Sequence, residues 1–171
     1  PRLISSAASD VYKRQDNGYG AFFKQSSGSI TNSVIDINCA AVNTNGFKQT
    51  GSIKHTLVID DNTLTTAEGA GITAYDQAWI SASRNTISGA EQGSGIAIRS
   101  STADLYYNNV GPIGGFNGLW IYGTSEVTAI GNNITNTGKE AVVHGEYHYR
   151  DSGWPSTVSY THLRAHETAY H

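Results

Sequence analysis

Several kinds of residue are scarce in this sequence, and each scarcity argues against a particular structural feature or class of protein. Methionine is absent from all 171 residues, so we expect the chain to be an internal piece of a longer protein. Cys39 is the single cysteine, which excludes an intramolecular disulfide framework and leaves the redox compartment open. No apolar run is long enough to cross a bilayer as a helix, so we expect no membrane span.

Charge is also sparse, at 15% of residues. Residues 16–157 carry 7 basic and 12 acidic side chains, and so a net charge of −5. A nucleic-acid-binding protein usually has the opposite balance, and we expect no nucleic-acid partner. Glycine, by contrast, is plentiful at 19 residues, which favours a β protein rich in turns over a helical one.

The two ends of the chain match opposite strands of one short DNA. The codons GAT GTG TAT AAG AGA CAG encode residues 10–15, and the reverse complement of that DNA, read in another frame, encodes residues 158–162. This DNA resembles the transposase end sequence used to prepare sequencing libraries. We therefore interpret residues 1–15 and 158–171 as adapter-derived tails, and residues 16–157 as the natural fragment.

An asparagine recurs at a nearly constant interval through the natural fragment. The spacings are 24, 23, 23 and 24 residues, at Asn38, Asn62, Asn85, Asn108 and Asn132. An apolar residue follows each asparagine two positions later, at Ala40, Leu64, Ile87, Val110 and Ile134. Repeats of this length indicate a solenoid.

A second recurrent position lies later in each repeat. It is occupied by Gly46, Gly71, Gly95, Gly118 and Ala141, and an apolar residue follows each of them. Around both positions, polar and apolar residues alternate over short stretches that turn residues separate, a pattern typical of strands. Gly20 extends the series back by one repeat.

Coils of about 23 residues can bury a core only by stacking on one another. Equivalent asparagines then lie one above another at the strand spacing of roughly 4.8 Å and can hydrogen-bond as a ladder. A leucine-rich repeat would show regular leucines, and an antiparallel sandwich would not keep these constant offsets. The sequence predicts an all-β solenoid of five to six coils.

The phrases Asp61-Asn62-Thr63-Leu64, Arg84-Asn85-Thr86-Ile87 and Gly131-Asn132-Asn133-Ile134 resemble the right-handed parallel β-helix repeat family, which includes pectate-lyase-like proteins. The resemblance covers residues 19–143 and implies a secreted or cell-envelope protein. It implies one of several activities: polysaccharide lyase, glycoside hydrolase, epimerase, phage tailspike or adhesin. The family's catalytic pattern is not matched residue by residue, so the catalytic residues stay unknown and fold does not supply the activity.

One outward row is a candidate sugar-binding surface. If the residue after each column glycine points inward, the residues two and four positions after the glycine point outward. These positions are Lys48, Thr73, Ala97, Trp120 and Val143, then Thr50, Tyr75, Arg99, Tyr122 and Gly145. We expect Tyr75, Arg99, Trp120 and Tyr122 to form a platform for sugar rings and an acidic group on them. A solvated face stabilised by stacking is the alternative.

A second outward column holds Asp36 and Asp60, which the repeat places on adjacent coils. Such a pair can share a calcium ion or act as acid and base in glycoside cleavage. Surface aspartates beside turns are also common for local reasons. We expect no other cofactor or metal, and the sequence indicates no oligomeric state.

The function hypotheses are thus a polysaccharide-binding or polysaccharide-processing β-helix and a non-catalytic stalk or adhesin module. Acidic clusters or an Arg and Lys pair in further coils would favour the enzyme. A long run of equivalent coils would favour the stalk.

The tail interpretation predicts that residues 1–15 and 158–171 make few contacts with the coils. Removing both should leave the melting temperature unchanged, as calorimetry of the trimmed and full chains would measure. A drop of several degrees on trimming would contradict it.

Overall fold

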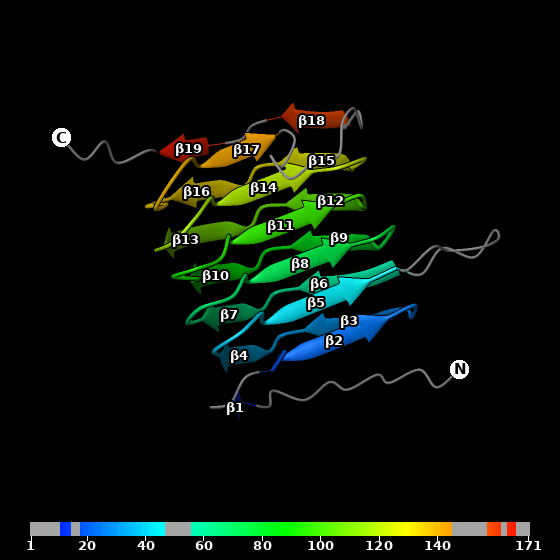
Figure 1. Cartoon of the computed structure of the whole chain (residues 1–171), viewed down its shortest axis with the longest axis vertical. Coiled ribbons are helices and arrows are strands. Elements are labelled where there is room, and N and C mark those ends of the chain that lie inside the picture. The colour runs from blue at the N-terminus through cyan, green and yellow to red at the C-terminus, as the bar shows by residue number, and fades with distance from the viewer. Residues whose placement is uncertain (1–10, 15–17, 47–55, 145–156, 162–163, 167–171) are drawn as a thin grey trace.

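The computed structural model describes residues 11–14, 18–46, 56–144, 157–161 and 164–166, and in these residues it contains strands and no helix. The strands are short, and all the pairings between them are parallel. They form three sheets that run along one axis as a solenoid (Figure 1). The predicted all-β solenoid is confirmed.

Each coil contributes one strand to each sheet. Sheet I contains β2 (Ala21–Lys24), β5 (Val42–Asn45), β8 (Ile72–Tyr75), β11 (Ile96–Arg99), β14 (Leu119–Tyr122) and β17 (Val142–His144). Sheet II contains β3 (Gly28–Thr31), β6 (Thr56–Asp60), β9 (Trp79–Ser83), β12 (Thr102–Tyr106), β15 (Glu126–Ile130) and β18 (Thr157–Thr161). Sheet III contains β1 (Val11–Arg14), β4 (Val34–Ile37), β7 (Thr63–Thr66), β10 (Thr86–Gly89), β13 (Asn109–Ile113), β16 (Asn133–Thr135) and β19 (Arg164–His166).

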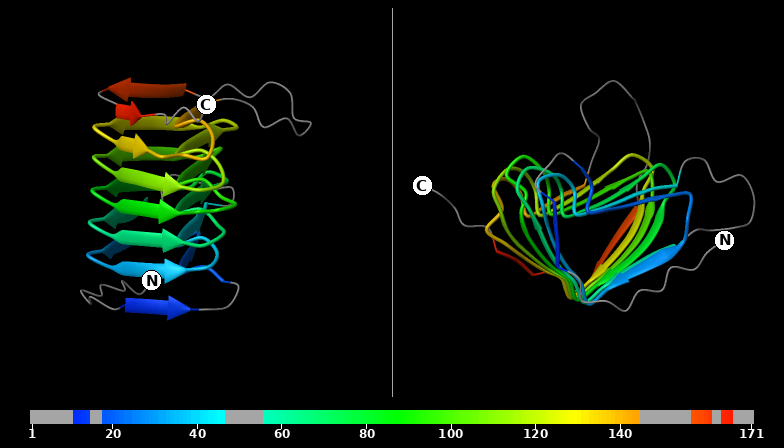
Figure 2. Two further views of the ribbon diagram at one scale, coloured as in Figure 1. Left: turned by 90° about the vertical axis from the view of Figure 1, so that its left-hand side faces the viewer. Right: turned by 90° about the horizontal axis from the view of Figure 1, so that it is seen from below.

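The core lies inside the coils, which superpose along the axis into one closed outline (Figure 2). Strand alternation sends every second side chain inward, and in the central coils most of these side chains are apolar and fully buried in all three sheets. In sheet III, for example, Ile87 pairs in register with Leu64 on one side and Val110 on the other. The core is therefore a set of aliphatic columns, and no coil buries its apolar residues without its neighbours.

A ladder of buried asparagines joins the coils at the turn between sheets II and III. The Oδ1 atom of Asn85 accepts hydrogen bonds from the backbone N–H and the Nδ2 of Asn62, at 3.0 and 2.9 Å. Asn108 and Asn132 repeat this arrangement in the next two coils. Each Nδ2 also donates to a carbonyl of sheet II in the preceding coil, as Asn85 does to Ile59 at 2.8 Å. The predicted ladder is confirmed from Asn62 to Asn132.

The prediction for Asn38 is wrong. The residue in register before Asn62 is Ser33, whose backbone N–H donates to Asn62 Oδ1 at 3.0 Å, whereas Asn38 follows β4. Val34 pairs with Thr63, so this coil takes 29 residues, while the next, from Thr63 to Thr86, takes 23. The extra residues lie between β5 and β6, and the constant-period alignment could not place them.

The same slip displaces the glycine column in that coil. Val42 pairs with Ile72, so Ala41, and not Gly46, precedes the inward residue of β5. The predicted outward residues Lys48 and Thr50 lie outside the described residues, and Asn43 and Asn45 occupy their register. Gly71, Gly95, Gly118 and Ala141 stand where the column predicts.

The residue before each ladder position has a left-handed backbone. The φ angles are 51°, 57°, 54°, 55° and 66° at Asn32, Asp61, Arg84, Tyr107 and Gly131. This conformation is unfavourable for a bulky residue such as Tyr107. The ladder hydrogen bonds beside it offset that cost, so the turn keeps its shape through quite different side chains.

The expectation that the ends make few contacts is wrong for three segments. β1 pairs with β4, β18 with β15, and β19 with β16, each in parallel register. The first and last coils present unpaired backbone N–H and C=O groups, and an extended segment of any origin can pair with such an edge. The pairing therefore does not bear on the DNA origin of these residues.

Within the part of the chain that the structure describes, no helix has the length and apolarity needed to cross a membrane.

Substituting Ile87→Ala should lower the free energy of unfolding by about 2 to 4 kcal/mol, because it leaves a cavity between Leu64 and Val110. Chemical denaturation would measure the change. The exposed neighbour Thr86 supplies the control, since Thr86→Ala should change stability by less than about 0.5 kcal/mol. Equal effects of the two substitutions would contradict the core assignment.

Asn85→Ala should also destabilise, by about 1 to 3 kcal/mol, because it leaves buried donors of Asn62 without an acceptor. Asn133→Ala is the matched control. Its side chain donates to Asn109 Oδ1 at 2.9 Å, but both residues are exposed. In thermal melts, the melting temperature of Asn85→Ala should be well below that of Asn133→Ala. An unchanged melting temperature for Asn85→Ala would show that the ladder contributes nothing to stability.

Candidate functional site

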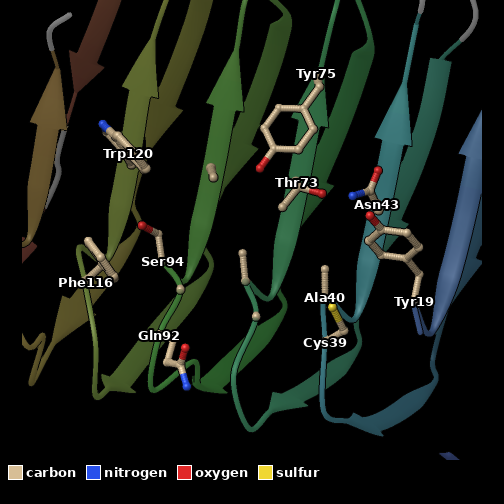
Figure 3. A pocket seen from close by; sticks show the side chains of 14 residues that line it. Tyr19, Cys39, Ala40, Asn43, Thr73, Tyr75, Gln92, Ser94, Phe116 and Trp120 are labelled. Atoms are coloured by element: carbon tan, nitrogen blue, oxygen red, sulfur yellow. The ribbon is translucent and has the colours of Figure 1, made fainter. Parts of the chain in front are cut away.

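A groove of about 340 Å³ lies on the outer face of sheet I (Figure 3). Its floor comes from sheet I, and one wall comes from the loops that lead from sheet III into sheet I. Because the coils stack in register, equivalent residues of successive coils follow one another along the groove. The groove therefore runs parallel to the solenoid axis.

The floor is a row of four residues in consecutive strands. Asn43, Thr73, Ala97 and Trp120 pair in that order across β5, β8, β11 and β14. Thr73 and Ala97 point away from the core, yet they are only 3% and 4% exposed. The floor is thus narrow, with small side chains in the middle and an indole at one end.

Glycines keep the loop wall low in its middle. A Cβ on Gly69 would lie 2.5 Å from the backbone of Cys39, and a Cβ on Gly93 would lie 2.5 Å from the backbone of Gly69. Only glycine permits loops to stack this closely, and Thr66 Oγ1 fixes one of them by donating to the Gly69 carbonyl at 2.9 Å. Phe116 then raises the wall at the Trp120 end, with Lys139 Nζ 4.3 Å from its ring centre.

The residues predicted as a sugar platform come together. Arg99 lies between Tyr75 and Tyr122 in sheet register, and Trp120 stacks on Tyr122 with ring centres 4.4 Å apart. Tyr75 and Trp120 line the groove, while Arg99 and Tyr122 stand on the same face in the row beside the floor. The four side chains therefore share one surface, as the period-two alternation predicts.

Serines at the following corner hold the ends of these strands. Ser101 Oγ donates to the Arg99 carbonyl at 2.8 Å, and Ser125 Oγ donates to the Tyr122 carbonyl at 2.8 Å. Ser101 Oγ also accepts the backbone N–H of Ala78 at 3.2 Å. These bonds position the Arg99 and Tyr122 backbones without using the groove-facing side chains.

Burial raises the pKa of the Tyr75 phenol above its usual value, while a side-chain hydrogen bond with Tyr122 and the positive charge of Arg99 act in the opposite direction. The phenol thus stays protonated at neutral pH and can both donate and accept a hydrogen bond.

Aromatic side chains stand at both ends of the groove. Tyr19 stacks on Phe22 at one end, with ring centres 5.2 Å apart, and the Trp120–Tyr122 pair stands at the other. Phe22 precedes Asn43 in the floor row, so Phe22 and Trp120 are four strand steps apart. At roughly 4.8 Å a step, the row extends over about 19 Å. That length suits several consecutive rings of an extended chain.

The lining is neutral throughout. Among the described residues that form the groove, none is Asp, Glu, Lys, Arg or His. The surface offers aromatic faces, two side-chain amides, hydroxyls and backbone groups, and these are groups that uncharged sugars bind. Proton transfer by a carboxylate has no candidate among these residues.

The structure does not bring Asp36 and Asp60 together, so the predicted acid pair is wrong. Asp36 lies on β4 of sheet III and pairs with Thr65, whereas Asp60 lies on β6 of sheet II and pairs with Ser83. The coil lengthened between β5 and β6 caused this error as well. Within the described residues, no group of three or more His, Cys, Asp and Glu side chains could hold a metal ion.

Asp60 instead belongs to an ion pair at the turn after sheet II. Arg84 contacts the Asp60 carboxylate. It also forms an ion pair with Asp61, in which Arg84 Nε lies 2.9 Å from Asp61 Oδ1. The hydrogen bond from Arg84 lowers the pKa of the Asp61 carboxyl, and its charge acts in the same direction. This bridge links two successive coils, and its contribution is present at neutral pH and lost as the pH falls through the lowered pKa.

Sequence reasoning missed several groove residues. Asn43 was hidden by the slip in the lengthened coil, because the constant period placed Lys48 at its register. Ser94 and Phe116 belong to the loops before Gly95 and Gly118, where no period-two pattern indicates direction. The available signal for these two residues was the pair of glycines that follow them, Gly95 and Gly118, which mark the start of a strand. A residue next to the start of a strand must face either a neighbouring loop or solvent.

Comparison of the chain with protein-family models, with curated proteins and with solved structures finds no match.

Proposed function

We propose that this chain is part of a right-handed β-helix protein, similar to the pectate-lyase-like group, that binds an extended polysaccharide in the groove on sheet I. A secreted or cell-envelope location fits this proposal. The observation that carries it is the neutral, aromatic-ended groove parallel to the axis, lined by Tyr19, Tyr75, Phe116 and Trp120. Aromatic rings pack on the apolar faces of sugars, and repeated strands offer repeated contacts to a repeating ligand.

The proposal is a binding function without catalysis in the described groove. Glycoside hydrolysis needs two carboxyl groups across the scissile bond, and the lining residues supply none. A charged sugar would find the exposed guanidinium of Arg99 in the row beside the floor, between Tyr75 and Tyr122. Arg99 therefore adds affinity for an acidic chain, while the aromatic residues hold neutral and acidic chains alike.

Titration calorimetry of the full chain would test this proposal with two probes, a β-1,4-linked glucose tetrasaccharide and an α-1,4-linked galacturonate tetrasaccharide. Trp120→Ala should weaken binding of either probe about tenfold, because it removes the stacking surface at one end of the groove. Trp79→Ala is the matched control, since Trp79 lies on the outward side of sheet II and should not affect binding.

Arg99→Ala should weaken galacturonate binding about fivefold and leave glucose binding within about twofold. Arg84→Ala, which removes a guanidinium from the turn after sheet II, should leave both affinities unchanged. If the folded chain binds neither tetrasaccharide, or if Trp120→Ala changes nothing, the sheet I face is structural and the stalk or adhesin hypothesis takes the place of this proposal.

A further inference from the structure

One buried hydroxyl in the groove is not used by the fold. Ser94 lines the groove and is only 3% exposed, and its Oγ has no hydrogen-bond partner in the part of the protein that the structure describes. The two other buried serines of that part, Ser101 and Ser125, both donate to backbone carbonyls. A buried hydroxyl without a partner carries a desolvation cost and calls for an explanation.

The backbone around Ser94 is held firmly, so its Cβ has a defined position. The Ser94 carbonyl accepts the N–H of Gly71 at 3.3 Å, and the next residue, Gly95, donates to the carbonyl of Asn117 at 3.0 Å. Glycine is required on both sides. A Cβ on Gly93 would strike the backbone of Gly69, and one on Gly95 would lie 2.3 Å from Val110. Ser94 is thus the one side chain between these two glycines, at a fixed point of the wall.

At the Trp120 end of the groove, the residues around the Ser94 side chain are of the kinds that bind a sugar ring. Trp120 on the floor and Phe116 on the wall belong to the next coil, and in Figure 3 the Ser94 side chain points from the loop toward Trp120. Asn117, which aligns with Ser94 in that coil, is 6% exposed and has an Oδ1 atom without a partner in the described residues. Of the buried side-chain oxygens that lack a partner in the described residues, only Ser94 Oγ belongs to a residue that lines the groove.

We propose that Ser94 is a specificity-determining residue, whose hydroxyl bonds a hydroxyl of the sugar ring stacked on Trp120. The inference rests on the proposed polysaccharide function and adds the residue that selects a hydroxylated ring at this subsite. A ring stacked on the indole presents its hydroxyls at its edge. Rotation about the Cα–Cβ bond of Ser94 brings its Oγ, which is shielded from solvent in the free protein, to that edge, where it exchanges its missing hydrogen bond for one with the ligand. A site built to bond a sugar hydroxyl rejects an analogue that lacks it, because the protein partner is then left unpaired.

The proposal predicts that stability and affinity respond in opposite ways to Ser94→Ala. The substitution removes a buried hydroxyl that the free protein leaves unbonded, so the melting temperature should stay the same or rise. Affinity for the β-1,4-linked glucose tetrasaccharide should fall about threefold to tenfold, as for the loss of one hydrogen bond. A residue with a merely structural role would lower stability and leave affinity unchanged.

Ser33→Ala is the matched control. Ser33 Oγ donates to the Thr31 carbonyl at 3.0 Å, at the corner between sheets II and III and away from the groove. This variant should lose some stability and bind the tetrasaccharide as the unsubstituted chain does. Monodeoxy tetrasaccharides add a second measurement. The analogue that lacks the hydroxyl bonded by Ser94 should bind the unsubstituted chain and the Ser94→Ala variant equally, because neither complex can form that hydrogen bond.

The outcomes separate the two proposals. If the unsubstituted chain binds and Trp120→Ala weakens binding, but Ser94→Ala binds normally, the assignment of Ser94 is wrong and the polysaccharide function stands. If every monodeoxy analogue distinguishes the two chains as strongly as the parent sugar does, the assignment is also wrong. If the unsubstituted chain binds neither tetrasaccharide, both proposals are wrong.

Discussion

Backbone hydrogen bonding between successive coils is the constraint on which the rest of the structure depends. Every strand pairs in parallel with the equivalent strand of the next coil, so each position along a coil becomes a column along the axis. The aliphatic core, the asparagine ladder and the groove are all built from such columns, which are filled by different side chains. A residue that suits its column strengthens two neighbours at once, which explains why glycine, asparagine and isoleucine recur where they do.

Much of the fold could be predicted from the sequence because the columns are visible as a period. The period from Asn62 to Asn132 gives the ladder, and Gly71, Gly95 and Gly118 give the start of three sheet I strands. Prediction failed where a coil changes length. The coil between Ser33 and Asn62 is longer by about a quarter, so a constant period placed Asn38 on the ladder and Asp36 beside Asp60. Spacing alone cannot show on which side of an insertion a residue belongs.

For a related reason, the strand residues of the candidate site could be predicted from the sequence and its loop residues could not. Tyr75, Arg99, Trp120 and Tyr122 sit on strands, where alternation determines direction, and they do share one face. Cys39, Ser94 and Phe116 sit in loops, and their contribution to the groove depends on how closely one loop stacks on the next. That closeness is set by Gly69 and Gly93, whose missing side chains matter through the space they leave. The sequence shows these glycines plainly, but only the structure shows what they allow.

Because the rise per coil is constant, the solenoid presents positions at a fixed spacing to any periodic ligand that lies along its axis. The floor of the groove offers one equivalent position about every 4.8 Å. A polymer whose own repeat length differs slightly from this value matches the positions over a few units. Beyond those units, it no longer lies in register with the strands. Contacts therefore add up over a short stretch only, and lengthening such a protein by further coils repeats the short site instead of extending it.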